Sequence, residues 1–516
     1  MYNICSLIIF SLILSSSDAV NSHTFRAAVV DYEPIKTDKV TLESTLENAY
    51  VLAKYALEAR WEDVDLLVFP EYGLTGMVQP DRNNATNTFA QDIPDPTLIS
   101  WNPCDEPDLF PNTKVLQVVS CAAKYNAMVI AANLIGREPC NNTDADCPSD
   151  GQYFYNTNVM FYKNGTFAAK YHKKHLFMEP YINPSNKLDY TIIDIGFTKV
   201  ACVICYDIVH REPIITLIKE KGVKNIIFST AWINILPFIT APQLYTSIAR
   251  GLGINLIAAN HFAPNMSMMG SGIFTSGKGA LNQTFDLSSP GKMIIADVPL
   301  NPEKINSGDL KCDDDSHYDH SEEFGAVHPP LMLVDPFTKT PYPSSQVTSK
   351  LNTFVNIRLT EFSFFYFDQN RMENHVDLCK GDFCCHLDYA FSNKDDTVYA
   401  FAVNDGVMQV EGDPYEVQVC AVMRCEREDA STCGQVPLVE TKTTFKELSI
   451  EGTFDNNFVL PQMFGTDLQL IHGKDWNFKS VNCYDHDGSD ITTGKVALTG
   501  PTEQPIMVAS LLGLFD

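Results

Sequence analysis

The fold is decided by residues 199–213, which read KVACVICYDIVHREP. Five apolar residues, 200–204, are followed abruptly by Cys205, Tyr206 and Asp207. Such a short apolar run predicts a strand that is buried in a sheet. Open α/β sheets carry their reactive groups at the carboxyl ends of parallel strands, and this prediction puts Cys205 at such an end. The plainer interpretation is a core cysteine, because free cysteine is among the most buried residue types.

Predicted strands alternate with predicted helices on both sides of this run. The helical pattern is clearest in residues 41–60, where apolar residues recur at steps of three and four. A hairpin is predicted over residues 156–171, because the turn dipeptide Asn164-Gly165 separates two strand-like segments. The other predicted strands are 25–32, 64–69, 127–134, 223–228 and 254–259, and the other predicted helices are 115–125, 213–221 and 242–252. This alternation indicates a layered α/β domain.

The pattern changes near residue 310. Residues 312–325 form an acidic loop that could bind a cation, although a solvated acidic loop is the plainer interpretation. Beyond it, segments such as 397–403 and 417–422 are rich in β-branched and aromatic residues, and eight cysteines lie between residues 311 and 516. We therefore expect an α/β domain over residues 23–310 and a β-rich domain with disulfide bonds over residues 311–516.

Several features predict a secreted glycoprotein. Residues 4–14 are apolar and small residues follow them, which is typical of a signal peptide ending near residue 22. The block is too short to span a bilayer comfortably. The net charge of -27 argues against nucleic-acid binding and against attraction to anionic lipid surfaces. Five N-X-Ser/Thr sequons are candidate glycosylation sites: Asn84, Asn141, Asn164, Asn265 and Asn282.

The cysteines also favour an oxidising compartment. Cys140 and Cys147 flank a polar loop and are predicted to form a local disulfide bond. When Cys205 is set aside, an odd number of cysteines remains after the signal peptide. At least one more thiol is then free or paired between chains, and Cys202 and Cys121 are the candidates because their neighbours are apolar. We expect no metal and no cofactor, since no His/Cys cluster has the spacing of zinc ligands.

Three stretches carry residues that together could hydrolyse an amide. Glu71 lies in LLVFPEYGLTG, Lys173 in KYHKKHLF and Cys205 in VICYD. A thiolate can attack the carbonyl, a carboxylate can accept the thiol proton, and a lysine can stabilise the oxyanion. Each residue also has a plainer interpretation. Glu71 could lie in a surface turn, and Lys173 could belong to a solvated basic turn with Lys170 and Lys174.

In this order, the three stretches resemble the Glu-Lys-Cys signature of the nitrilase superfamily of carbon–nitrogen hydrolases. The detail resembles the vanin and biotinidase branch and extends over almost the whole mature chain. One departure is Ala201, where the family commonly has glycine four residues before the nucleophile. The matching motifs are FPEYGLTG, YHKKHLF, CYDI, STAWINILP (229–237), MGSGIF (269–274), EGTFDNNFVLP (451–461) and PTEQPIMVASLLGLFD (501–516).

The resemblance implies a four-layer α-β-β-α sandwich followed by a smaller β-rich domain. It implies that Glu71 is the general base, Lys173 the oxyanion stabiliser and Cys205 the nucleophile, with Trp232 and Asn234 candidates for the substrate pocket. The implied reaction cleaves a secondary amide through a thioester, with pantetheine giving pantothenate and cysteamine. A biotin-amide is the alternative substrate, because no motif separates the two activities.

Two other classes remain open. A catalytically silent homologue could bind a ligand or serve as a storage protein, although the intact trio argues against it. An acyltransferase would need an amine that outcompetes water at the thioester.

The apolar segment 506–515 is interpreted as a final strand rather than a lipid-anchor signal, because no polar spacer precedes it. The expected partner is therefore a small-molecule amide, without a stable membrane anchor.

Overall fold

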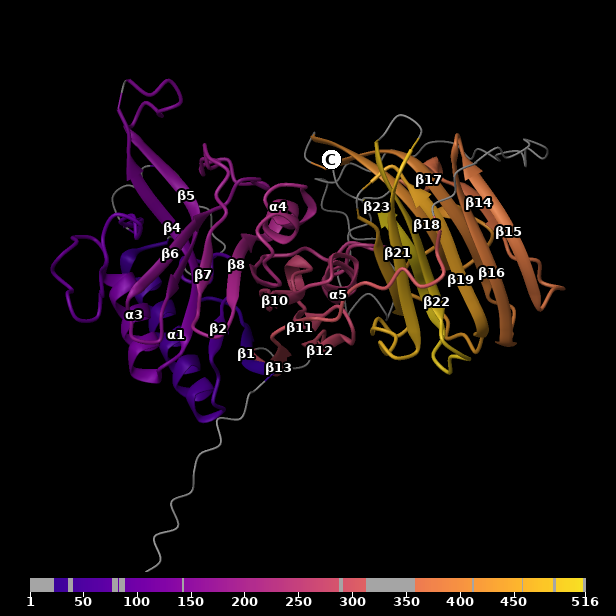
Figure 1. The fold of residues 1–516 in the computed structure, drawn as a ribbon, viewed down its shortest axis with the longest axis horizontal. Helices are drawn as coiled ribbons and strands as arrows, with labels where there is room; N and C mark the ends of the chain where they lie inside the picture. The colour runs from indigo at the N-terminus through magenta and orange to yellow at the C-terminus, as the bar shows by residue number, and fades with distance from the viewer. Residues whose placement is uncertain are drawn as a thin grey trace, which may run out of the picture.

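The computed structural model describes residues 23–35, 40–76, 82, 89–141, 143–286, 291–311, 358–410, 413–456, 458–485 and 489–513. The proposed signal peptide, the sequon at Asn84 and the acidic loop 312–325 lie outside these residues. The described elements form an N-terminal α/β domain and a C-terminal β-sandwich, which lie side by side (Figure 1).

The first sheet of the N-terminal domain has the order β13-β1-β2-β4-β5-β6, with β3 beside β4. Strands β1, β2 and β4 are parallel, and β13, β5 and β6 add to them antiparallel. The strands are β1 Thr24–Asp31, β2 Leu66–Val68, β3 Gln91–Asp92, β4 Val129–Pro139, β5 Gln152–Phe161, β6 Phe167–His172 and β13 Lys292–Pro299. The predicted hairpin around Asn164-Gly165 is the β5–β6 pair.

The second sheet has the order β12-β11-β10-β9-β8-β7. Its centre, β8-β9-β10, is parallel, so the carboxyl ends of these strands meet at one edge. The strands are β7 Ile192–Asp194, β8 Lys199–Ile204, β9 Asn225–Ser229, β10 Asn255–Ala259, β11 Ser271–Thr275 and β12 Gly279–Thr284. The apolar run before Cys205 is β8, and residues 200–204 are all fully buried, as the sequence predicts.

The alternation of side chains along β1 shows how the layers stack. Ala27 and Val29 belong to the core shared with the second sheet. Ala28 and Val30 point the other way and pack with helices α1 (Leu42–Trp61) and α3 (Lys114–Asn126). Helices α4 (Ile214–Lys219) and α5 (Ala241–Leu252) cover the outer face of the second sheet (Figure 1). The result is the α-β-β-α sandwich that the sequence analysis anticipates.

The C-terminal domain consists of two antiparallel sheets that enclose a core of their own. Strand β23, inside the proposed final strand 506–515, is wholly buried between β18 and β20, so its apolar sequence reflects burial on both faces. One sheet contains β14 Ser363–Tyr366, β17 Val398–Val410, β18 Asp413–Cys425, β23 Ile506–Gly513 and β20 Leu460–Gly465. The other contains β15 Glu373–Lys380, β16 Phe383–Asn393, β19 Thr444–Phe454, β22 Asp490–Leu498 and β21 Trp476–Tyr484.

The disulfide bonds confirm one cysteine prediction and correct another. Cys140 and Cys147 are bonded, as predicted. Cys121 is bonded to Cys104 and is therefore not the extra free thiol. The apolar neighbours of Cys121 belong to the buried face of α3, whereas Cys121 itself is half-buried and faces the loop that carries Cys104. Among the described cysteines, Cys202 and Cys205 are free. The C-terminal domain contains Cys379–Cys384, Cys385–Cys420 and Cys425–Cys433.

Candidate active site

Cys205 lies at the carboxyl end of β8 and begins a short 3-10 helix, Cys205–Val209. Its φ of +44° is in the left-handed region, which is strained for a residue with a side chain. Asp207 holds this turn in place. Its carboxylate accepts hydrogen bonds from the backbone N–H of Ile204 at 3.3 Å and from that of His175 at 2.8 Å. The turn is therefore tied to the loop that follows Lys173.

Glu71 and Lys173 meet in the interior of the N-terminal domain. Glu71 follows β2, Lys173 follows β6, and both are 2% exposed. The Lys173 Nζ lies 2.7 Å from Glu71 Oε1. The backbone N–H of Ala231, after β9, donates to Glu71 Oε2 at 2.9 Å. Neither charged residue lies in a solvated turn, so the structure favours the constellation over both surface interpretations.

A second carboxylate, Glu179, completes the ion-pair cluster. Its Oε2 lies 2.7 Å from Lys173 Nζ, and its Oε1 accepts hydrogen bonds from Asn156 Nδ2 at 2.7 Å and from the Tyr72 hydroxyl. Asn156 Nδ2 also donates to Glu71 Oε1 at 2.8 Å, so it bridges the two carboxylates. Sequence analysis missed Glu179. Its only signal there is a carboxylate in the apolar segment LFMEP, which lies in an irregular loop without periodicity.

Burial and charge pairing shift the pKa values of Glu71, Lys173 and Glu179 differently. Burial acts to lower the pKa of the Lys173 ammonium, but Glu179 and Glu71 outweigh it and raise this pKa well above its ordinary value. Burial raises the pKa of the Glu71 carboxyl; Lys173 opposes this increase and the charge of Glu179 adds to it. Burial also acts to raise the pKa of Glu179, but Lys173 outweighs it and leaves that pKa below its ordinary value. Of the two carboxyls, Glu71 is therefore the one suited to exchange protons.

Burial is the largest influence on the Cys205 thiol. It is 6% exposed, and its burial raises its pKa above the ordinary range. The charge of Glu71 raises the pKa further, whereas Lys173, the Thr230 side chain and the Ala231 N–H lower it. The strand pairing places Cys205 near this cluster, because its neighbour Ile204 pairs with Ser229, two residues before the Ala231 N–H that binds Glu71. A thiol whose pKa is raised needs a base before it can attack a carbonyl, and Glu71 is the candidate for that base.

Residues 230–240, here called the active-site loop, carry both sequence-derived pocket candidates. Trp232 is 7% exposed, and its indole Nε1 donates to the carbonyl of Ile239 at 2.8 Å. Asn234 is fully buried. Its Nδ2 donates to the carbonyls of Ser267 and Met269, and its Oδ1 accepts from the Ala241 N–H. The Asn234 amide thus braces the loop internally, and of the two candidates Trp232 is the one that keeps some exposed surface.

The remaining site candidates lie on the surface. The four sequon asparagines within the described residues, Asn141, Asn164, Asn265 and Asn282, are all exposed, which glycan attachment requires. Among the described residues, no group of three or more His, Cys, Asp and Glu side chains could hold a metal ion. No helix in the described part of the chain is long and apolar enough to cross a membrane.

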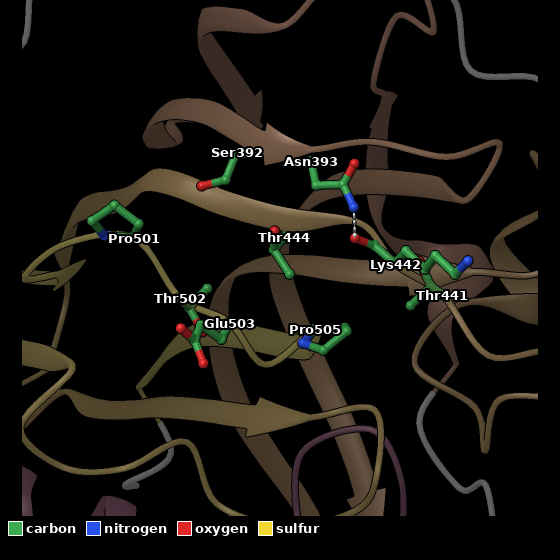
Figure 2. Close-up of a pocket in the computed structure, with 9 residues that line it drawn as sticks. All are labelled: Ser392, Asn393, Thr441, Lys442, Thr444, Pro501, Thr502, Glu503 and Pro505. Carbon is green, nitrogen blue, oxygen red and sulfur yellow. Dashed lines mark hydrogen bonds between the residues drawn. The ribbon is translucent and has the colours of Figure 1, made fainter.

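A hollow of about 540 Å³ opens on the C-terminal domain. Figure 2 shows Thr444, Thr502 and Glu503 around it, with Asn393 Nδ2 donating to the carbonyl of Lys442. None of the residues that line it belongs to the Glu71–Lys173–Cys205 constellation. The hollow is therefore separate from the candidate active site.

Comparisons with known proteins identify the families and sequences to which this chain is similar. Residues 26–267 match the carbon-nitrogen hydrolase family, and residues 351–515 match the vanin C-terminal domain family. A pantetheinase from Mus musculus is 30% identical over 95% of this chain and 88% of its own length. A biotinidase from Bos taurus is 32% identical over 83% of this chain and 81% of its own length. A crystal structure of an amidase from Nesterenkonia sp. is 17% identical, with a TM-score of 0.40, over 54% of this chain and 92% of that one.

The chain is thus an amide-hydrolysing enzyme of the carbon–nitrogen hydrolase class. Within this class, it belongs to the vanin and biotinidase branch of the nitrilase superfamily. The family and the fold class inferred from the sequence motifs are both confirmed.

Proposed function

We propose that this chain is a secreted amidase that cleaves pantetheine into pantothenate and cysteamine. The observation that carries the proposal is the buried cluster in which Lys173 joins Glu71 and Glu179 beside Cys205. Similarity to pantetheinases over nearly the whole chain supports the substrate. The domain limits proposed are 1–22 for the signal peptide, 23–310 for the catalytic domain and 311–516 for the second domain.

The first half of the reaction forms a thioester. Glu71 accepts the proton of the Cys205 thiol, and the sulfur attacks the amide carbonyl carbon. The carbonyl oxygen becomes an oxyanion, which the Lys173 ammonium stabilises. Glu71 then donates its proton to the amide nitrogen, the carbon–nitrogen bond breaks, and the amine leaves.

In the second half, water replaces the amine. Glu71 accepts a proton from water, and the resulting hydroxide attacks the thioester carbonyl. The carbon–sulfur bond breaks, the acid leaves, and Glu71 returns its proton to the sulfur. The sum is amide plus water giving acid plus amine. Trp232 is proposed to contact the substrate, because it follows Ala231, whose N–H binds Glu71, and keeps an exposed fraction of 7%.

The substrate is tested by measuring amine release from pantetheine and from a biotinyl-amide with the same preparation. We expect kcat/KM for pantetheine to exceed that for the biotinyl-amide by at least about 100-fold, because a site that hydrogen-bonds one substrate disfavours another that leaves its polar groups unpaired. The biotinyl-amide is the second candidate because biotinidases are as similar in sequence as pantetheinases. Preference for it would keep the mechanism and replace the substrate. Release from neither would contradict the proposal.

Glu179→Gln should alter the pH dependence of the reaction. The proposed base must be ionised, so the rate falls as the pH drops through the raised pKa of Glu71. The charge of Glu179 is one cause of that elevation, so its removal should move the acid limb of kcat/KM to lower pH. We also expect kcat to fall about 10-fold, because Lys173 loses one of the two carboxylates that position it.

The measurement is a pH profile of kcat/KM for wild type and variant. Glu451→Gln is the matched control, since Glu451 pairs with Lys495 at 2.9 Å on the second domain. An acid limb that stays in place in Glu179→Gln, or that moves equally in Glu451→Gln, would show that Glu179 does not set the pKa of the base.

A further inference from the structure

The two domains touch along helix α5. Figure 1 shows α5 between the second sheet of the catalytic domain and the C-terminal sandwich, and every residue of α5 is buried. Gly251 shows how close the approach is, because a Cβ added there would lie 2.6 Å from the carbonyl oxygen of Val459. Arg250 lies over the ring of Trp476 at 3.8 Å and donates to the carbonyl of Gly473 at 2.7 Å. The interface therefore combines tight backbone packing with specific polar contacts.

Gln462 of strand β20 carries a polar contact from the second domain into the active-site loop. Its Nε2 donates to the carbonyl of Phe238 at 2.7 Å. Its Oε1 accepts hydrogen bonds from Gln243 Nε2 at 2.9 Å and from the Ser510 hydroxyl at 3.0 Å. Gln462 is 1% exposed, so water cannot readily replace its side-chain amide. A substitution that leaves the buried partners without hydrogen bonds therefore costs stability.

Two other segments of the second domain contact the same part of the loop. The ring of Phe362 stacks on that of Phe238, with centroids 6.3 Å apart and planes 20° from parallel. Gly434 lies so close to Pro237 that an added Cβ would be 2.4 Å from the proline Cβ. The loop residues Pro237 and Phe238 are thus held from three separate directions.

The other end of the loop reaches the reacting groups. The Trp232 indole N–H donates to the carbonyl of Ile239, the residue after Phe238. One residue before Trp232, the Ala231 N–H donates to Glu71 Oε2. A short series of bonds therefore runs from Gln462 through the folded loop to the carboxylate of Glu71.

We propose that Gln462 is a positioning residue for catalysis, through which the second domain fixes the active-site loop and hence the orientation of Glu71. This inference rests on the proposed function, in which Glu71 is the general base. The proposal gives the second domain a part in the reaction. Without the second domain, the catalytic domain would lack the Gln462 contact that it needs for its full rate.

The test replaces Gln462 by leucine in the full chain. We expect kcat for amine release to fall about 10- to 100-fold, the effect of a small misplacement of a catalytic group, while KM changes less than threefold. The alkylation rate of Cys205 by iodoacetamide should fall in parallel, because it needs the same base but no substrate. Gln462→Glu, which keeps the side-chain length and the accepted bonds but replaces the donor, should lower kcat in the same direction.

Gln418→Leu is the matched control. Gln418 is a largely buried glutamine of β18 whose amide exchanges two hydrogen bonds with Asp455, inside the second domain. We expect it to lower the melting temperature without lowering kcat by more than twofold. Equal losses of activity in the two variants, or a kcat within twofold of wild type for folded Gln462→Leu and Gln462→Glu, would overturn the positioning role.

A double-mutant cycle tests the route. Trp232→Phe removes the N–H that joins the two ends of the loop. If Gln462 acts through this bond, the effects of Trp232→Phe and Gln462→Leu on kcat should be non-additive, whereas Trp232→Phe and Gln418→Leu should act independently. Additive effects of Trp232→Phe and Gln462→Leu would show that Gln462 does not act through the Trp232–Ile239 hydrogen bond. If wild type cleaves neither amide, the proposed function fails, and the alkylation rates still decide the positioning role.

Discussion

Cys205→Ala should lose amide hydrolysis almost completely, with kcat at least about 10⁴-fold below wild type. The reason is that the substitution removes the atom that forms the thioester, and no other described thiol can take its place. Cys202, the other free cysteine, is fully buried in β8, where it accepts a hydrogen bond from Asn158. The measurement is the rate of amine release under saturating pantetheine.

Cys202→Ala is the control for this prediction. It removes a free thiol three residues away without touching the Glu71–Lys173 cluster, so it should reduce the melting temperature more than the activity. Iodoacetamide should label one thiol in native wild type and in Cys202→Ala, and none in Cys205→Ala. Activity that survives in Cys205→Ala, or that disappears equally in both variants, would contradict the assignment of Cys205 as nucleophile.

Lys173→Met should damage both activity and stability. The ammonium is the proposed oxyanion stabiliser, and loss of such a group typically costs about 10²- to 10³-fold in kcat. It is also the cation that neutralises two buried carboxylates, Glu71 and Glu179. Removing one member of a buried ion pair typically costs about 3–5 kcal/mol of the free energy of unfolding. The measurements are kcat and denaturant unfolding of the same preparations.

Two variants separate the catalytic from the structural effect of Lys173. In Lys173→Met/Glu179→Gln, one uncompensated negative charge is also removed, so part of the stability should return while kcat stays low. Lys174→Met is the matched control, because Lys174 Nζ donates to an uncharged group, the carbonyl of Ser185, at 2.9 Å. Recovery of activity in the double variant would show that Lys173 acts through charge balance alone.

The C-terminal domain is relevant to the predictions for Cys205 and Lys173. It contacts the active-site loop, and this loop donates a hydrogen bond to Glu71. Gln462 and Phe362 hold that loop at Phe238, while Ala231 contacts Glu71 at its other end. The contacts of this cluster thus extend to packing that spans both domains, which is a physical reason for testing every variant in the full chain.

Local sequence patterns predicted a layered α/β domain, whereas the four-layer sandwich was implied by the resemblance to the family, and strands such as β7, β11, β12 and β13 were not predicted. The apolar run before Cys205, the 3.6-residue periodicity of residues 41–60 and the turn at Asn164-Gly165 depend on neighbours in the chain, and each corresponds to an observed element. Glu71 and Lys173 could be identified because short motifs surround them. Their meeting could not be deduced from spacing alone, since 102 positions separate them.

The tertiary structure decided everything that depends on residues from distant segments. Glu179 sits in an irregular loop, so only the folded chain shows that it shares Lys173 with Glu71. Cys121 pairs with Cys104 because helix α3 turns it toward that loop, which its apolar neighbours in sequence conceal. Local patterns predicted the central strands and the helices of the first domain, and the motifs pointed to the reactive residue types. Their charges, partners and the contact from Gln462 were decided by tertiary packing, because burial and hydrogen bonding depend on which segments meet in space.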